Sequence, residues 1–441
     1  MLNNPVFVSI ILMLILCIFR CNVMLSIIIS ALVAGVMAGI MPDGESFNIA
    51  KSLIQTLSIF IEGMKGNLET ALSYILLGVL AAAISYTNLT TILINKISKF
   101  ITKSKIYFVV AIAIISCFSQ NLVPVHIAFI PILIPPLLGI MNKMQIDRRM
   151  VACALTFGLQ TPYISIPVGF GLLFFSILKK EMANNGLIVE ISKIASIMWM
   201  AAIPMIIGLI LAIIIFKKPK IYKDIDQNTP QNLDDIKMGI KEWGALIGII
   251  VAFIIQICFK SLPLGALLGI VAMIICGGIS YKKMDLVFDK GIHIMGFIAF
   301  VMLVAAGYGA ILRETGGINE LVNTVASLAG GKFGGAVLML IIGLFITIGI
   351  GSSFGTIPII TAIYYPLALK LGFSTEAIIL LIGIAAAVGD AGSPASDSTL
   401  GPTSGLNFDG KHNHIYGTCI PTFVFFNIPL IIFGAIFAMI L

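Results

Sequence analysis

Residues 383–405, GIAAAVGDAGSPASDSTLGPTSG, constrain the fold of this chain more than any other stretch. The stretch begins as an apolar helix and then fills with glycine, proline, serine, threonine and two carboxylates, Asp390 and Asp397. A regular helix does not continue through such closely spaced glycines and prolines. Broken backbone at membrane depth is tolerated only where protein buries it or where it lines a wet cavity. The stretch therefore predicts a spanning segment that unwinds at its centre to handle an ion or a polar solute.

The composition of the whole chain supports a membrane setting. Of its 441 residues, 59% are hydrophobic and 11% are charged, whereas soluble domains carry about 25% charged residues. The net charge of +7 comes from Lys and Arg that cluster in short loops, which orients inner-membrane proteins and indicates no nucleic-acid partner. We therefore predict an all-α polytopic protein of the bacterial inner membrane, surrounded by the lipid bilayer.

Apolar runs predict about ten transmembrane helices, because a span needs roughly 20 apolar residues. The predicted spans cover residues 5–19, 22–41, 68–86, 150–178, 194–216, 244–258, 262–280, 293–312, 375–405 and 418–440. Three mixed or amphipathic segments, 50–66, 88–103 and 317–331, are predicted to lie at the membrane surface.

Two further segments are predicted to form re-entrant hairpins. Residues 105–141 have two apolar arms around a polar tip, and each arm is too short to cross a bilayer. Both flanks are basic, so both ends are expected on the cytoplasmic side and the tip near mid-membrane. Residues 334–371, with the tip GIGSSFGTIP, predict the second hairpin.

The order of elements indicates two inverted repeats. Residues 1–216 form the first repeat, 217–243 a lysine-rich cytoplasmic linker and 244–441 the second repeat. Each half contains a helix pair, a span, a surface helix, a hairpin, a broken span and a last span. The break at 389–394 aligns with a break predicted at 158–162. An odd number of spans in each half gives opposite topologies, the plan of secondary transporters that bind solutes at broken helices near the midplane.

Asp390 and Asp397 are the candidate ion-coupling groups, because ionisable residues at membrane depth are rare and functional by default. Ser396 and Ser398 add the oxygen ligands that a hard cation such as Na⁺ prefers. The alternative is an extramembrane loop with aspartate turns. No metal other than Na⁺ at these aspartates and no cofactor is expected.

Other polar residues at the hairpin tips and breaks are candidates for solute binding, because half-helix N-termini attract solute carboxylates. They are Ser119, Gln120, Asn121, His126, Gln160, Thr161, Ser352, Ser353, Thr356 and Ser393. The alternative for the serine tip is small-residue helix packing. His126 either shuttles a proton or bonds a neighbouring backbone group. His412 and His414 form either a metal pair or, as we favour, a polar turn.

Two short motifs resemble catalytic sites without supporting an enzyme. GSSFG at 351–355 fits a serine-hydrolase pattern but lacks the strand–turn–helix setting that this pattern needs. VGD at 388–390 resembles intramembrane aspartyl proteases, but Ala387 replaces the first glycine of their pattern. A channel is a further alternative, although paired broken helices fit alternating access better.

The stretch GDAGSPASDSTLGPTSGLNFDGKHNHIYGTCIPTF, with NIPLIIFG downstream, resembles the NhaC-type Na⁺/H⁺ antiporter family of the ion-transporter superfamily. The likeness is closest to its YuiF-like subgroup of amino-acid transporters, covers essentially the whole chain and is most specific over 383–434. It implies scaffold and transport domains, hairpin tips that meet at a central site, homodimers and cation coupling. For this subgroup it implies an amino acid as solute, with histidine a candidate.

The predicted function is therefore secondary active transport of a small amino acid, driven by Na⁺ or H⁺ through alternating access. The alternative is a Na⁺/H⁺ antiporter that exchanges the two cations directly, with both competing for Asp390.

Overall fold

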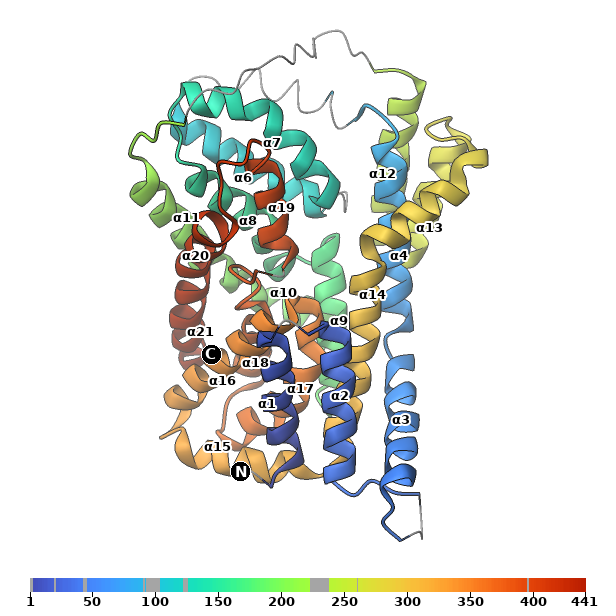
Figure 1. Cartoon of the computed structure of the whole chain (residues 1–441), viewed down its shortest axis with the longest axis vertical. Helices are drawn as coiled ribbons and strands as arrows, with labels where there is room; N and C mark the ends of the chain where they lie inside the picture. Colours follow the sequence, from blue (N-terminus) through green and yellow to red (C-terminus); the bar gives the residue numbers. More distant parts are fainter. Residues whose placement is uncertain are drawn as a thin grey trace.

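The computed structural model describes residues 3–19, 21–42, 46–89, 92, 104–121, 126–222, 238–259, 261–394 and 396–441, and these ranges contain helices and no strand. The helices of the first half are α1 (Pro5–Ile18), α2 (Val23–Met37), α3 (Ile49–Lys65), α4 (Leu68–Ser85), α6 (Lys105–Asn121), α7 (His126–Lys143), α8 (Arg148–Ser165), α9 (Phe170–Asn184), α10 (Ile191–Met198) and α11 (Ala202–Phe216). Those of the second half are α12 (Ile240–Phe259), α13 (Leu262–Ile275), α14 (Met284–Glu314), α15 (Gly317–Leu328), α16 (Lys332–Ile350), α17 (Ser353–Lys370), α18 (Thr375–Ala387), α19 (Asp397–Leu406), α20 (Ile420–Thr422) and α21 (Ile428–Ile440) (Figure 1).

The structure confirms the predicted all-helical membrane fold. Five described helical stretches are long and apolar enough to cross a bilayer: Leu68–Ser85, Ile191–Phe216, Met295–Glu314, Lys332–Ile350 and His414–Ile440. The pair α8 and α9, bent by 45° at a short break, adds a sixth. Apolar side chains on the outer face of α11, including Ile206, Ile210 and Ile214, are exposed, as expected for contact with lipid.

Both segments predicted as hairpins have ends that meet. Lys105 Nζ, at the start of α6, donates to Gln145 O beyond the end of α7 at 3.3 Å. Lys332 Nζ, at the start of α16, lies 5.9 Å from the ring centroid of Phe373 beyond the end of α17. Each segment therefore enters and leaves on one side, the α6–α7 pair in the upper half of Figure 1 and the α16–α17 pair in the lower half. The internal repeat of 1–216 in 244–441 stays a prediction.

The first two predicted spans differ from the structure. Helices α1 and α2 have 14 and 15 residues, a rise of about 22 Å each, whereas the apolar layer is about 30 Å thick. Asn4, just before α1, donates to Gly317 O at the α15 end of the molecule, 2.8 Å away. Val23, at the start of α2, lines a central cavity. The two helices therefore form a short pair whose turn reaches the middle of the molecule.

The segment predicted as a surface helix over 50–66 also differs. Figure 1 shows α3 upright below α4, and both helices pack along the 31-residue α14. Ser52, Thr56 and Phe60 form the buried stripe of α3, so the helix packs against protein along this stripe, while Glu62 and Lys65 stay exposed. Most of the predicted surface helix over 88–103 lies outside the described residues.

The break in the first broken span lies within the interruption GLQTPYISIPVGFG, residues 158–171, that the sequence predicts, but later than the 158–162 position given by the repeat alignment. Helix α8 continues through Pro162 to Ser165, and the chain unwinds over 166–169. Ile166 is extended, with φ −128° and ψ 127°, and immediately precedes Pro167. Because a residue before proline is driven out of the helical region, Pro167 ends α8, not Pro162.

Candidate functional site

The second broken span unwinds where the sequence predicts. Helix α18 ends at Ala387, and α19 begins at Asp397. Between them Gly389 and Gly392 have φ of +96° and +93°, a conformation that glycine adopts more readily than other residues. The freed backbone groups lie in a buried setting and therefore need other partners.

Side chains from distant helices supply those partners. Gln160 Nε2 of α8 donates to Ala387 O at 2.7 Å. The fully buried Asn427 accepts from Gly389 N at 3.0 Å and donates to Ala391 O at 2.6 Å. Asn427 therefore fixes the backbone on both sides of Asp390 and sets the direction of its carboxylate.

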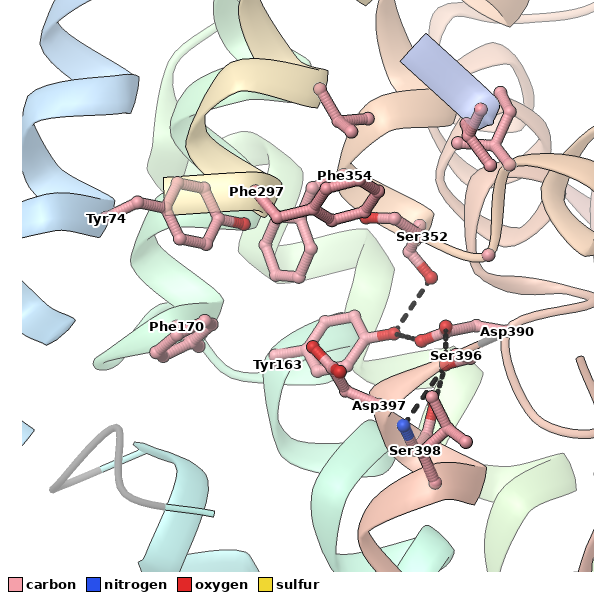
Figure 2. Close-up of a pocket in the computed structure, with 16 residues that line it drawn as sticks. Tyr74, Tyr163, Phe170, Phe297, Ser352, Phe354, Asp390, Ser396, Asp397 and Ser398 are labelled. Atoms are coloured by element: carbon pink, nitrogen blue, oxygen red, sulfur yellow. Dashed lines mark hydrogen bonds between the residues drawn. The ribbon is translucent and has the colours of Figure 1, made fainter. Parts of the chain in front are cut away.

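Asp390 is 6% exposed, and its hydrogen-bond partners are hydroxyl groups. Oδ2 accepts from Tyr163 OH at 2.5 Å and Oδ1 from Ser396 Oγ at 2.5 Å (Figure 2). Tyr163 OH also bonds Ser353 Oγ at 2.8 Å, and Ser396 Oγ bonds Ser398 Oγ at 2.7 Å. Within the described residues, no Lys or Arg forms an ion pair with Asp390. A buried carboxylate without a counter-charge is stabilised by taking up a proton or a metal cation.

The Asp390 carboxylate faces a cavity of about 330 Å³ at the centre of the molecule. Ligand pockets of about 300–1,000 Å³ accept small organic molecules. The cavity is lined by Val23, Tyr74, Tyr163, Phe170, Phe297, Val301, Ile350, Gly351, Ser352, Ser353, Phe354, Asp390, Ser396, Asp397, Ser398 and Leu400.

Three helices begin at this cavity. The first residues of α9, α17 and α19, which are Phe170, Ser353 and Asp397, all line it. A helix N-terminus carries a partial positive charge and unpaired N–H groups. The cavity therefore combines two carboxylates with three positive helix ends, a setting that suits a solute with both charges.

Aromatic rings form the other wall of the cavity. The Phe354 ring lies 5.1 Å from that of Tyr163, 5.7 Å from that of Tyr74 and 5.9 Å from that of Phe170, measured between centroids. Phe297 of α14 completes the wall (Figure 2).

The structure brings six of the predicted site residues to the cavity: Ser352, Ser353, Asp390, Ser396, Asp397 and Ser398. The other described ones do not line it. Gln160 caps α18, and Ser393 Oγ donates to Ile348 O at 3.0 Å. Thr356 Oγ1 donates to Ser352 O at 2.9 Å, and Thr161 Oγ1 is buried without a described partner. The side chains of Ser119, Gln120, Asn121 and His126 lie outside the described part of the structure.

Sequence reasoning missed the aromatic wall, Tyr163 and Asn427. Asn427 has a local signal, because an amide within the apolar run 418–440 is unusual at membrane depth. Tyr163 lies between Pro162 and the break, so its neighbours also mark it. The phenylalanines carry no such signal, since they resemble ordinary core residues and come from different helices.

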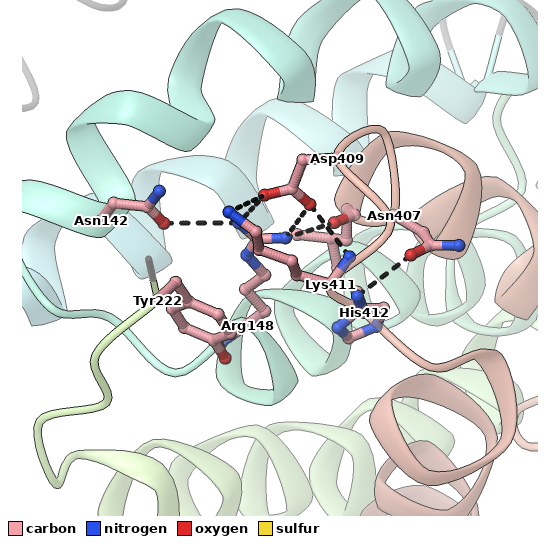
Figure 3. A network of polar contacts seen from close by, with 8 residues as sticks. Asn142, Arg148, Tyr222, Asn407, Asp409, Lys411 and His412 are labelled. Atoms are coloured by element: carbon pink, nitrogen blue, oxygen red, sulfur yellow. Dashed lines mark hydrogen bonds and ion pairs between the residues drawn. The ribbon is translucent and has the colours of Figure 1, made fainter. Parts of the chain in front are cut away.

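A second polar cluster, around Arg148, anchors the other end of α19 (Figure 3). The fully buried Arg148 makes two bonds to the Asp409 carboxylate, of 2.5 and 2.7 Å, and donates to Leu406 O at 2.9 Å. Its guanidinium lies 4.4 Å from the ring centroid of Tyr222. Burial favours the neutral form of Asp409, but the bonds and charge of Arg148 outweigh it and hold the pKa of Asp409 below its usual value.

The two histidines of the H-x-H motif lie beside this cluster and bond protein groups. His412 ring Nε2 lies 2.8 Å from Thr418 Oγ1, and His414 Nδ1 lies 2.8 Å from Thr403 Oγ1. Burial, followed by the positive charge of Arg148, lowers the pKa of His412 to about 4. These contacts fit the polar-turn interpretation.

Comparison with known proteins gives related sequences and a related fold. The model of the Na⁺/H⁺ antiporter family matches residues 154–435, and that of a second Na⁺-H⁺ antiporter family matches residues 4–101. The Bacillus subtilis (strain 168) protein named "Putative amino acid transporter YuiF" is 47% identical over 405 residues, which cover 88% of this chain and 91% of that protein.

Two solved transporter structures share the fold. MtrF of Neisseria gonorrhoeae, from a class of antimetabolite efflux pumps, has a TM-score of 0.63 at 14% identity and covers 99% of this chain and 96% of its own. The YdaH transporter of Alcanivorax borkumensis has a TM-score of 0.64 at 12% identity and covers 99% and 98%. With the family match over 154–435 and the YuiF likeness, these findings show that the chain is a multi-pass membrane transporter of the Na⁺/H⁺ antiporter family.

Proposed function

We propose that this transporter moves a small amino acid, with Na⁺ or H⁺ as the coupling ion, by alternating access. The observation that carries the proposal is the buried Asp390 carboxylate, bonded by Tyr163 and Ser396 hydroxyls and open to a 330 Å³ cavity. Transport of this kind involves no chemical conversion of the solute and requires no organic cofactor. Histidine remains one candidate solute.

The coupling ion is assigned to Asp390. A proton neutralises the carboxylate directly, whereas Na⁺ would draw its remaining ligands from hydroxyls such as those of Ser396 and Ser398. Either ion removes the unfavourable free energy of a bare buried charge, so the loaded and empty carriers differ in electrostatic stability.

The solute is assigned to the cavity between the helix ends and the aromatic wall. Its carboxylate would meet the N-termini of α17 and α19, and its ammonium group would face Asp397, which lines the cavity and forms no ion pair among the described residues. The name of the YuiF relative supports an amino acid as solute.

Alternating access requires that these groups separate from a scaffold. The α4–α14 contact is a candidate scaffold contact, because a Cβ added to Gly78 would lie only 2.6 Å from Gly291 O. Hairpin α16–α17, α18 and α19 form the candidate moving part. Assembly as a homodimer, which the family likeness implies, belongs to the same proposal.

A proteoliposome experiment tests the function. Uptake of a panel of the twenty amino acids is measured with and without inward Na⁺ and pH gradients. Gradient-dependent uptake of one or a few amino acids is the expected result.

The second candidate function is direct Na⁺/H⁺ exchange, which the description of the matched family favours. Proton movement driven by Na⁺ in the absence of any amino acid, with no uptake of any member of the panel, would establish the exchanger and overturn the amino-acid proposal.

A further inference from the structure

One buried tyrosine hydroxyl has no partner in the described structure. Four tyrosines, Tyr74, Tyr163, Tyr308 and Tyr364, are fully buried. Three of their hydroxyls are bonded: that of Tyr163 to Asp390 and Ser353, that of Tyr308 to Ser9 Oγ at 2.9 Å, and that of Tyr364 to Met339 O at 2.6 Å. The Tyr74 hydroxyl is buried and has no hydrogen-bond partner among the described residues. An unsatisfied buried hydroxyl is unfavourable, so its retention at this position needs an explanation.

Tyr74 lies on the opposite side of the cavity from Asp390. It comes from α4, and Figure 2 shows its hydroxyl directed into the cavity toward Phe297. Its ring makes edge contacts with Phe170, at 5.8 Å and 76°, and with Phe354, at 5.7 Å and 88°. These contacts fix the direction of the hydroxyl before any solute arrives.

We infer that the Tyr74 hydroxyl binds a polar group of the solute side chain, so that the carrier selects amino acids with hydrogen-bonding side chains. This inference rests on the proposed amino-acid function. If the charged groups of the solute lie at Asp397 and the helix ends, its side chain extends toward the aromatic wall. Phe170, Phe297 and Phe354 offer no hydrogen-bonding group there, which leaves the hydroxyl of Tyr74.

The expected difference in affinity between a polar solute and its apolar isostere follows from the way a buried polar group affects binding. An apolar pocket discriminates weakly between isosteres, whereas a site with a buried polar group strongly rejects an analogue that leaves this group unpaired. An apolar isostere in this cavity would leave the Tyr74 hydroxyl unpaired, and a polar solute would satisfy it.

Binding of shape-matched pairs to the purified full-length protein in detergent tests the inference. The pairs are threonine with valine, asparagine with leucine, and glutamine with methionine, titrated calorimetrically into wild type, Tyr74→Phe and Tyr364→Phe. In wild type, the polar member of a bound pair is expected to bind about tenfold or more tightly than its isostere. In Tyr74→Phe the ratio should fall to about one, through loss of affinity for the polar member.

The control variant separates this role from a structural one. Tyr364→Phe removes a hydroxyl that bonds Met339 O away from the cavity, so it should lower Tm and leave the ratio unchanged. Tyr74→Phe should leave Tm of the solute-free protein unchanged or raise it, because it removes an unsatisfied group.

Two results would overturn the inference while amino-acid binding itself persists. One is equal affinity within every bound pair in wild type, and the other is equal weakening of both members by Tyr74→Phe. If wild type binds no amino acid, the proposed function fails first and the inference fails with it.

Discussion

The two ends of the ten-residue helix α19 each hold a buried carboxylate, and the two carboxylates have opposite surroundings. At the C-terminal end the Asp409 side chain, 4% exposed, makes a two-bond ion pair with Arg148. At the N-terminal end Asp390, 6% exposed, is bonded by the hydroxyls of Tyr163 and Ser396. Two carboxylates with little exposed area can therefore have different roles.

The difference lies in what neutralises the charge. The Arg148 guanidinium neutralises Asp409 permanently and also caps α19 through Leu406 O, which favours a fixed anchor. The hydroxyls around Asp390 supply hydrogen bonds and no charge, so neutralisation is left to a mobile ion. One end of α19 is thus suited to stability, and the other to reversible binding.

Breaking the anchor should have the largest effect on stability. Arg148→Met removes both bonds to the Asp409 carboxylate and leaves Lys411, whose Nζ lies 3.9 Å away, as its counter-charge. This loss is expected to lower the free energy of unfolding by about 3–5 kcal/mol. Chemical unfolding in detergent measures the change. The double variant Arg148→Met/Asp409→Leu should recover most of the loss, since the carboxylate that lost its arginine is also removed. A double variant as unstable as the single one would show that the ion pair is not the source of the effect.

The second-largest loss of stability is expected from removing the Asn427 amide, which supports the Asp390 loop. Asn427→Leu leaves Gly389 N–H and Ala391 C=O unsatisfied, at about 1–2 kcal/mol for each group and so about 2–4 kcal/mol in all. Transport should fall as well, because Asp390 loses its fixed direction. Asn427→Gln keeps both amide groups on a side chain that is one methylene longer, and it should lie between Asn427→Leu and wild type in both measurements. Wild-type transport in Asn427→Leu would contradict the positioning role.

Lowering the pH should destabilise the region at the C-terminal end of α19 through His412. The unfolded imidazole has a pKa near 6.5 and binds a proton between pH 7 and 5, whereas the folded one stays neutral until about pH 4. The unfolded state therefore binds more protons in this range, and stability should fall by up to about 2 kcal/mol between pH 7 and 5. Tm measured against pH, with His412→Asn as comparison, checks this. An unchanged slope in the variant would assign the acid sensitivity to other groups.

The smallest effect is expected from a change at Gln160, which tests whether this residue caps a helix or binds the solute. Gln160→Met removes the bond to Ala387 O and also the buried Gln160 oxygen that has no described partner, so the net loss should be about 1 kcal/mol. The solute concentration for half-maximal uptake should stay the same, because Gln160 does not line the cavity. A several-fold change in that concentration would restore Gln160 as a binding residue.

The sequence predicts those parts of the molecule that contrast with an apolar background. The break around Asp390, the serine tip at 352–353 and the basic flanks of the first hairpin all stand out in this way, and the structure places them as expected. Pro162 and Pro167 show the limit, because either could end α8 and the backbone follows the second.

Features that form only through tertiary contacts do not stand out from their neighbours in the sequence. Arg148 and Asp409 read as ordinary loop charges, since nothing local reveals that a partner 261 residues away buries them. The aromatic wall likewise gathers Tyr74, Phe170, Phe297 and Phe354 from four helices that are far apart in sequence. The short length of α2 also escapes prediction, because its apolar run continues to Met41, past the helix end at Met37.

Gradient-driven uptake by Asp390→Asn in proteoliposomes tests the central claim most directly. The quantity is the ratio of uptake with and without the coupling gradient, with Tm and insertion compared with wild type and with Asp285→Asn, an exposed carboxylate at the start of α14, as control. Asp390 as the coupling group predicts a ratio that falls to about one in Asp390→Asn, while Tm and insertion stay near wild type and Asp285→Asn keeps the full ratio. A wild-type ratio in Asp390→Asn would contradict it.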